Sequence, residues 1–196
     1  MDSPPGGAGS RRTQKLQAIL DATERLMLEE GYAAVTFRSV ATAADVAPGL
    51  VQYYFPAVDD LFGAVLRHST DRLIAELAAA ARSERPLRAV WAYASDRRGS
   101  ALLMEFLALA NHRPQVRGIL GEGGERVRRA LLEAVTARWE ADGRDHDGVP
   151  AAAALFLLAW IPRMVFLEEA LGTLTGHPET IGLVERFLDD VEPLEP

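Results

Sequence analysis

Cysteine is absent from the 196-residue chain, which excludes a disulfide framework and a cysteine-based metal site. The sequence also lacks the GxSxG, HExxH, Walker and dinucleotide-binding motifs of common enzyme classes. Histidine is scarce, and its four copies share no metal-ligand spacing: His68, His112, His146 and His177. We therefore expect a protein that is not an enzyme and that requires no cofactor or metal.

Two stretches have the composition of a phosphate-binding or a calcium-binding loop but lack the residue spacing that such loops require. The glycines between residues 118 and 124 have no preceding strand and no phosphate-binding lysine, so they are interpreted as interruptions of a helix. The acidic stretch with Asp142, Asp145, His146 and Asp147 lacks the alternating ligands and closing glutamate of a calcium-binding loop. It is typical of a solvated turn.

Targeting and membrane signals are also missing. Residues 1–10 contain no apolar segment of a secretory signal and are expected to form a flexible tail. The longest apolar run, Val149 to Pro162, has fourteen residues, too few to cross a bilayer, and is interpreted as a buried helix. With 48% hydrophobic and 25% charged residues, the composition is that of a soluble protein, expected to be cytoplasmic and without a membrane partner.

The segment from Thr36 to Phe55 carries the most informative pattern in the chain. Its first half predicts a short helix that Thr36 caps, with apolar residues at positions i, i+3, i+4 and i+7: Phe37, Val40, Ala41 and Ala44. Asp45 then breaks the pattern, and Pro48 suits the first turn of a second helix. Val51 and Phe55, four residues apart, would pack this second helix onto the first. The pattern predicts a helix-turn-helix.

The remaining positions of the second helix would face outward. They are small residues followed by polar aromatics: Ala47, Gly49, Leu50, Gln52, Tyr53 and Tyr54. Such a face suits a helix that approaches a nucleic-acid groove and its phosphates end-first.

This segment resembles the DNA-binding head of the TetR family of bacterial transcriptional regulators. The resemblance extends over residues 11–66, through ILDATERLMLEEGYAAVT upstream and FPAVDDLFGAVL downstream. The alternative is a generic three-helix bundle, which has no need for paired tyrosines before Phe55 and Pro56 on an exposed helix end. The resemblance implies an all-α fold in which a helix-turn-helix domain at residues 11–57 precedes a helical effector-binding and dimerisation domain at 58–196.

The periodicity beyond the head predicts helices and few strands. A long connecting helix is expected from Asp59 to Ala81. Further helices are expected at Leu87–Ser95, Ala101–Asn111, Val116–Ala141, Ala151–Leu171 and Glu179–Val191. The breaks between them are Arg97-Arg98-Gly99, Arg113-Pro114, Asp142–Gly148 and Gly172–Pro178. About nine helices result, in agreement with the resemblance.

The net charge of −7 is unevenly distributed. Residues 11–56 contain five bases and five acids, whereas the chain after residue 56 contains sixteen arginines and twenty-two acids. A neutral head with a basic tip can contact a few phosphates, with an affinity that falls as salt is added. Arg11 and Arg12 are either a solvated first turn or contacts to the DNA backbone or minor groove.

The resemblance implies a role for each outward residue of the motif. Thr36 and Tyr54 would contact phosphates, and Tyr53 would pack near the sugar-phosphate chain. The residues nearest the base edges would be Arg38, Pro48, Gly49 and Gln52, with Ala47 and Leu50 offering apolar contact. Arg38 can pair with guanine and Gln52 with adenine. Three positions depart from the family pattern: Asp45 replaces a turn glycine, Gln52 a tyrosine and Val58 a phosphate-binding lysine.

Specific binding by one short helix generally requires two heads on a pseudo-palindromic site, so a homodimer is expected. The last two helices are the candidate interface, because the helix from Ala151 is apolar on nearly every face and must be buried all round. The resemblance implies an intersubunit four-helix bundle there. The alternative is that this helix is the centre of its own domain.

An effector site is less clearly marked. Candidate lining residues are large or polar groups on otherwise apolar helices: Trp91, Met104, Phe106, Leu107, Asn111, Trp160, Arg163 and Met164. The alternative is plain core packing, because aromatic and methionine side chains at helical spacing fill cores far more often than they contact ligands. If they do line a pocket, a moderately apolar small molecule is expected there.

Together these patterns predict a DNA-binding transcriptional regulator, a dimeric repressor that an effector releases from a pseudo-palindromic operator. The alternative function is a helical small-molecule-binding or scaffold protein that keeps the head without specific DNA binding.

Overall fold

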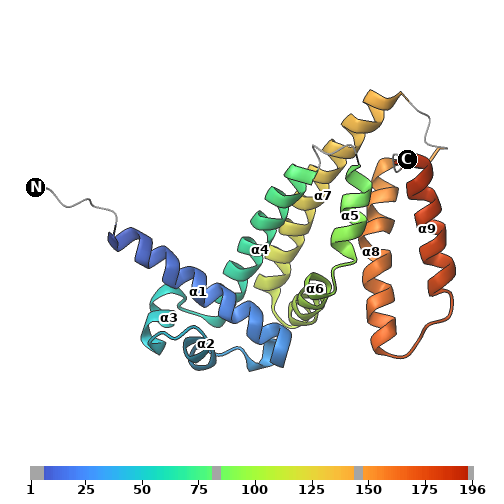
Figure 1. The fold of residues 1–196 in the computed structure, drawn as a ribbon. Helices are drawn as coiled ribbons and strands as arrows, with labels where there is room; N and C mark the ends of the chain where they lie inside the picture. Colours follow the sequence, from blue (N-terminus) through green and yellow to red (C-terminus); the bar gives the residue numbers. More distant parts are fainter. Residues whose placement is uncertain (1–6, 81–84, 144–147, 194–196) are drawn as a thin grey trace, which may run out of the picture. The chain divides into compact units, whose positions relative to one another are not determined.

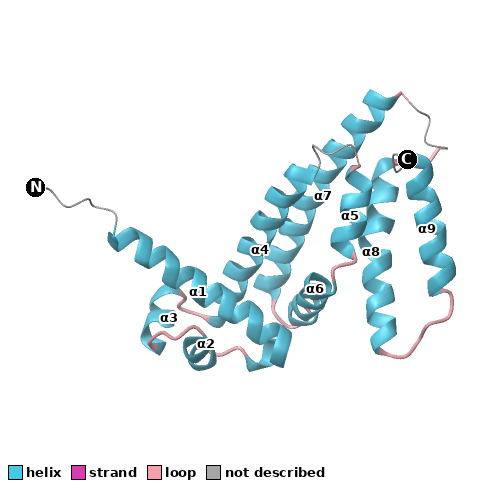
Figure 2. Ribbon diagram, in the orientation of Figure 1, coloured by secondary structure: helices cyan, strands magenta, loops and turns pink. Residues whose placement is uncertain are grey.

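The computed structural model describes residues 7–80, 85–143 and 148–193, and within them it contains helices and no strand (Figures 1 and 2). The α-helices are α1 (Gly7–Glu30), α2 (Phe37–Ala43), α3 (Pro48–Tyr54), α4 (Val58–Ala80), α5 (Pro86–Ala94), α6 (Arg97–Ala110), α7 (Pro114–Asp142), α8 (Ala151–Ala170) and α9 (His177–Val191). A short 3-10 helix, η1 (Tyr32–Ala34), joins α1 to α2. The predicted all-α fold of about nine helices is confirmed.

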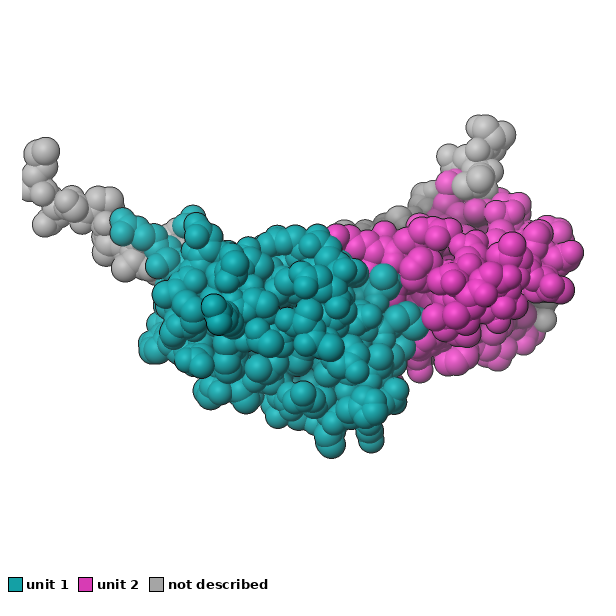
Figure 3. All heavy atoms as spheres, turned by 90° about the horizontal axis from the view of Figure 1, so that it is seen from below, with its two compact units in different colours: residues 1–69, 101–123 teal, residues 70–100, 124–196 magenta. Residues whose placement is uncertain are grey.

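The helices form two compact units, coloured separately in Figure 3. Unit 1 comprises the described residues up to Ser69 together with Ala101–Gly123, and unit 2 comprises Thr70–Ser100 with the described residues from Gly124 onward. Helices α4 and α7 each contribute to both units.

The core of unit 1 holds the head together with parts of the chain that follow much later. Ile19 and Met27 of α1, Val40 of α2 and Val51 of α3 are at most 1% exposed. They belong to the same buried cluster as Leu61, Phe62 and Val65 of α4, Phe106 and Leu109 of α6, and Val116 of α7. The helix-turn-helix therefore rests on α6 and the start of α7 as well as on α1.

The local features predicted for the motif are present. Thr36 caps α2 in a reciprocal capping box with Ser39, in which each side chain accepts a hydrogen bond from the other's backbone N–H. Asp45 adopts a left-handed backbone, with φ of 51°, in the turn where a glycine was expected from the resemblance. Pro48 occupies the first turn of α3. Val51 and Phe55 are buried, as the i, i+4 spacing predicted.

Unit 2 has a separate core, built mainly where α5 packs on α8. Leu87 and Val90 of α5, Leu155 and Leu158 of α8 and Leu188 of α9 are at most 2% exposed. Burial of leucine and valine side chains of this size, each worth about 1.5–3 kcal/mol, is the main stabilising contribution.

Several predicted helix ends were wrong. Helix α1 begins at Gly7, so residues 7–10 belong to it and not to the expected tail; residues 1–6 lie outside the described chain. Helix α6 begins at Arg97, within the predicted break, because the Asp96 carboxylate accepts the Gly99 backbone N–H at 2.7 Å and caps the helix. The acidic stretch that was interpreted as a solvated turn begins at Asp142, which is the last residue of α7; Asp145, His146 and Asp147 lie outside the described part.

Prolines explain two further differences. Helices α7 and α9 each start earlier than predicted, with Pro114 and Pro178 in their first turns, where the missing N–H has no intrahelical partner to lose. These residues were taken from the sequence as breaks between helices. They begin helices instead.

The apolar run from Val149, interpreted as a buried helix too short for a membrane, continues into a longer helix that is only partly buried in the single chain. Helix α8 has twenty residues and is long and apolar enough to cross a bilayer by length and composition, and only 28% of that stretch is buried. Phe156 and Leu157 are 50% and 51% exposed, and Met164 is 45% exposed. These side chains of α8 are therefore open to solvent in the single chain.

Candidate nucleic-acid interface

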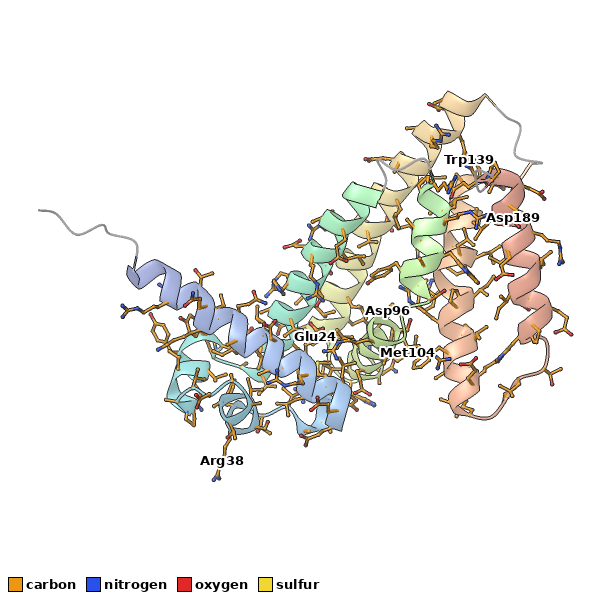
Figure 4. All side chains as sticks on the ribbon, viewed as in Figure 1. Glu24, Arg38, Asp96, Met104, Trp139 and Asp189 are labelled. Atoms are coloured by element: carbon orange, nitrogen blue, oxygen red, sulfur yellow. The ribbon has the colours of Figure 1, made fainter. Side chains whose placement is uncertain are left out.

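Helices α2 and α3 present all the predicted DNA-contacting residues on the surface of unit 1. Thr36 and Arg38 of the α2 end are exposed, as are Ala47, Pro48, Gly49 and Gln52, while Leu50 is half-buried. Figure 4 shows the Arg38 side chain projecting away from the ribbon of α2. The backbone at Gly49 is open: a Cβ built there meets nothing within 4 Å. These exposed and half-buried residues lie on α2, on α3 and at the positions just before each of these helices.

The C-terminal end of α3 is an aromatic cluster. Tyr53 is 70% exposed and meets the Tyr54 ring edge-on at 5.6 Å between centroids. Tyr54 lies against α1, where the Arg12 guanidinium stands 5.8 Å from its ring centroid and its hydroxyl donates to the Arg12 carbonyl at 3.4 Å. The exposed Arg12 is therefore held beside the motif, adding a positive charge to this end.

A hydrogen bond from α1 fixes the orientation of α2. The Arg25 guanidinium donates to the carbonyl of Ala43, the last residue of α2, at 2.8 Å. A cation at this end also interacts favourably with the helix dipole. No local sequence pattern indicates this role for Arg25, because the two residues are eighteen positions apart.

A second fixing contact comes from α6. The Glu105 carboxylate accepts the backbone N–H of Tyr32, in η1, at 2.7 Å. At the start of α4, Asp59 forms an ion pair with Arg113 at 2.7 Å, and Asp60 accepts a hydrogen bond from Gln115. Contacts of 54 or more positions in sequence separation thus tie η1 to α6, and the start of α4 to residues at the start of α7, within unit 1. The sequence carried no signal for any of them.

The predicted effector-lining residues are distributed over both units. Met104, Phe106, Leu107 and Asn111 belong to unit 1, whereas Trp91, Trp160, Arg163 and Met164 belong to unit 2. Phe106 is 2% exposed in the core of unit 1, and Asn111 is exposed just after α6 ends. In unit 2, Trp91 packs against the core and Met164 faces outward. Trp160 and Arg163 are brought together, with the guanidinium 5.9 Å from the indole centroid.

Neither acidic residue near the end of α8 is paired with Arg163. Glu168 interacts with His177 at 2.7 Å, and Glu169 forms an ion pair with Arg97 at 2.6 Å. Glu168 and Glu169 therefore form no ion pair with Arg163. Within the described ranges, no three histidine, aspartate or glutamate side chains gather in a way that could hold a metal ion.

In unit 2, a buried carboxylate after α9 caps the N-terminus of α5. Glu192 is 4% exposed and accepts the backbone N–H groups of Leu87 and Arg88, at the start of α5, at 2.8 and 2.9 Å. Burial raises the pKa of Glu192, although these hydrogen bonds and the Arg88 charge act in the opposite direction. The residue after α9 thus provides the cap that α5 lacks from its own sequence.

Unit 2 also carries exposed apolar side chains on α8, α9 and the segment between them, which together are called its exposed apolar surface. It comprises Phe156, Leu157, Met164, Leu167, Leu171, Leu174 and Leu183, each at least 36% exposed. Hydrophobic side chains gathered in this way are typical of a surface that another protein covers.

Comparison with known proteins places the head in a family. Residues 19–65 match the model of bacterial regulatory proteins of the TetR family. The chain is 26% identical over 131 residues to the HTH-type transcriptional regulator HbdR of Aromatoleum sp. (strain CIB), covering 63% of this chain and 57% of that protein. It is 36% identical over 119 residues to the HTH-type transcriptional regulator BetI of Burkholderia thailandensis, covering 56% and 60%. These alignments span less than two thirds of either relative.

Solved structures of other proteins share the fold. A crystal structure of a putative TetR-family regulator from Mesorhizobium loti matches with a TM-score of 0.71 at 18% identity, covering 92% of this chain and 96% of that one. The head of the chain thus matches the TetR family over residues 19–65, and the predicted resemblance to that family is confirmed.

Proposed function

We propose that the protein is a cytoplasmic, non-enzymatic transcriptional repressor that binds a pseudo-palindromic DNA operator as a homodimer and is released by a small-molecule effector. The observation that carries the proposal is the surface of α2 and α3, where every residue assigned to DNA contact is exposed or half-exposed while the opposite face is core. The functional boundaries we propose are residues 11–57 for DNA binding and 58–196 for effector binding and dimerisation.

The proposed contacts divide into two kinds. Arg38 and Gln52 read base edges in the major groove, each contributing on the order of 1–3 kcal/mol of discrimination between bases. Thr36, Tyr53 and Tyr54 position the head on the phosphates and sugars, which raises affinity without selecting a sequence. Ala47, Pro48, Gly49 and Leu50 form the small, apolar approach surface at the start of α3.

Dimerisation is proposed through the exposed apolar surface of α8 and α9. Two chains that cover this surface on each other would form a two-fold interface and present two heads. This arrangement accounts for the open face of α8 without placing the helix in a membrane. It also supplies the pair of recognition helices that a pseudo-palindrome requires.

Effector relief is proposed to act through the elements that hold the head. Because α6 and the first part of α7 share a core with α1–α3, a rearrangement of these helices or of α4 would move the head with them. An effector that fits one arrangement of the larger domain would lower operator affinity by its differential binding energy, typically about 1–3 kcal/mol.

Two variants test the proposed contacts. Gln52→Ala is expected to lower affinity for the operator while leaving binding to random duplex DNA nearly unchanged, because the lost bond is to a base. Tyr54→Phe is expected to weaken binding to both, because the hydroxyl acts on the backbone. The measurement is fluorescence anisotropy with each duplex over a range of salt concentrations, with thermal unfolding as the control for folding. Equal losses on both DNAs for both variants would contradict the assignment, and sequence-blind binding by the unmodified chain would favour a scaffold protein instead.

A further inference from the structure

Arg163 is a buried cation without an anionic partner in the described part of the chain. It lies on α8, is 8% exposed, and donates a hydrogen bond from Nη1 to the carbonyl of Ala159, one turn earlier. Its Nε atom is buried and has no hydrogen-bond partner. A charged group that is removed from water normally has its charge and its N–H donors matched. Here the Nε–H donor of the guanidinium is left without an acceptor.

The surroundings of Arg163 stabilise the cation only in part. Its guanidinium carbon lies 5.7 Å from the ring centroid of Tyr93, on α5, and 5.9 Å from that of Trp160. Aromatic faces attract a cation but cannot accept the in-plane N–H groups as a carboxylate does. Burial lowers the pKa of Arg163, a sign that desolvation outweighs what the neighbours return.

Tyr93 adds a second donor beside the guanidinium. Burial raises the pKa of the Tyr93 phenol, so it remains protonated at neutral pH and can donate its hydrogen. The charges of Arg163, Glu76, Arg72 and Asp96 also act on Tyr93. Glu76 is the acid with the largest effect among them, and its carboxylate forms an ion pair with Arg72 at 4.0 Å between Oε1 and Nε. The carboxylates of α8 are occupied by His177 and Arg97, so no acid on these elements is paired with Arg163.

We propose that Arg163 and Tyr93 bind the acid group of an organic anion, a carboxylate whose apolar or aromatic body lies against Trp160. A carboxylate matches the free edge of a guanidinium, with one oxygen on Nε and the other on the neighbouring nitrogen. The inference rests on the proposed function, because it names the chemical class of the effector of that regulator. The proposal identifies the effector as an anion, whereas the aromatic and methionine residues of the sequence predicted only a moderately apolar molecule.

A second copy of the chain is the competing source of the missing charge, since α8 lies in the proposed dimer interface. The open face of α8 carries Leu157 and Met164, which are 51% and 45% exposed, whereas Arg163 is buried against Tyr93 of α5. Arg163 therefore lies among the elements of its own unit and not on the open face. This placement favours a ligand held within unit 2.

The test uses the full-length protein and two matched pairs of probes: phenylacetate with phenylacetamide, and octanoate with octanamide. Each amide has the shape of its acid without the charge. We expect each acid to bind roughly 10–100-fold more tightly than its amide, the range that one or two charge-assisted hydrogen bonds provide. Isothermal titration calorimetry gives the affinities, and quenching of tryptophan fluorescence, to which Trp160 contributes, follows the site.

Arg163→Met is the informative variant, because methionine keeps an unbranched apolar chain and removes the unpaired charge. We expect it to fold at least as well as the native chain and to lose the preference for acid over amide. Arg128→Met is the matched control: Arg128 is also an arginine of unit 2, stacked on Phe156 at 5.5 Å, but it is exposed. It is expected to retain the preference.

The inference is overturned if acid and amide bind equally, if neither member of either pair binds up to its solubility limit, or if Arg163→Met retains the preference. It is also overturned if Arg163→Met dissociates the dimer in analytical ultracentrifugation, since the partner copy would then supply the anion. Operator binding separates this inference from the proposed function. Acids that bind through Arg163 without changing operator affinity would support the anion site and refute effector relief. Release of the operator equally by acids and amides would support effector relief and refute the anion site.

Discussion

Gly49 offers a substitution in which folding and DNA binding are expected to change in opposite directions. It lies near the start of α3, and a Cβ added there meets no atom within 4 Å. Gly49→Ala therefore creates no clash within the described chain. Alanine is favoured over glycine in a helix by up to about 1 kcal/mol, which raises the melting temperature by about 2–4 °C in a chain of this size.

The same methyl group would stand where the proposed DNA surface lies closest to the backbone. We expect operator affinity to fall roughly tenfold or more, because displacing even one hydrogen bond to a charged phosphate costs about 1.5–3 kcal/mol. Thermal unfolding measures the first effect. Fluorescence anisotropy with an operator duplex, obtained by selection from random DNA, measures the second.

Gly121→Ala is the matched control for this experiment. Gly121 is an exposed helical glycine of α7 in the same unit, and its Cβ also meets nothing within 4 Å. It should raise stability by a similar amount and leave operator affinity unchanged. If Gly49→Ala raises stability and binds the operator as well as the native chain, α3 does not approach DNA by this end, and the proposed orientation of the head is refuted.

Three other outcomes follow from the structure. Leu157→Glu, which places a charge on the exposed apolar surface of α8, should convert the dimer to monomers in analytical ultracentrifugation and abolish specific operator binding, and an unchanged dimer would exclude α8 from the interface. Gly63→Ala should be at least about 1 kcal/mol less stable to urea than Gly121→Ala, because its Cβ would lie 2.7 Å from Ile119 Cδ1; equal stability would show that Ile119 moves aside freely. Because burial raises the pKa of Glu192, the folded chain binds that proton more tightly than the unfolded chain does. The free energy of unfolding, relative to Glu192→Gln, should therefore fall as the pH rises from the ordinary glutamate value of about 4.3 through the raised pKa, and a difference that is constant with pH would contradict this.

The head could be predicted from the sequence because its determinants are local. The cap at Thr36, the left-handed turn at Asp45 and the proline at the start of α3 act within a few residues of their positions. The spacing of Val51 and Phe55 likewise identifies the buried side of α3. Such short-range signals state both where a helix starts and which of its faces is free.

The contacts that hold the head in place could not be predicted in this way. The bond from Arg25 to Ala43 and the bond from Glu105 to Tyr32 join residues eighteen and seventy-three positions apart. No periodicity relates such pairs. The start of α6 was missed for a different reason: Asp96 caps the helix, but the charged residues and glycine after it have the composition of a loop.

Composition alone was also insufficient for α8. Its sequence is apolar on nearly every face, which predicted burial all round, yet the single chain leaves Phe156 and Leu157 half-exposed. Hydrophobicity shows that a surface is to be covered but does not show whether the same chain covers it. The burial of Arg163 could not be predicted either, since no sequence pattern distinguishes a buried arginine without a counter-ion from an arginine in a surface ion pair.

Selection of bound fragments from random duplex DNA by the purified protein tests the central claim most directly. A head that reads the major groove through α3 and works in pairs should enrich one short half-site in two inverted copies, with centres about one helical turn, or roughly 34–36 Å, apart. Recovery of no enriched sequence, or of a single half-site without its inverted partner, would contradict the account.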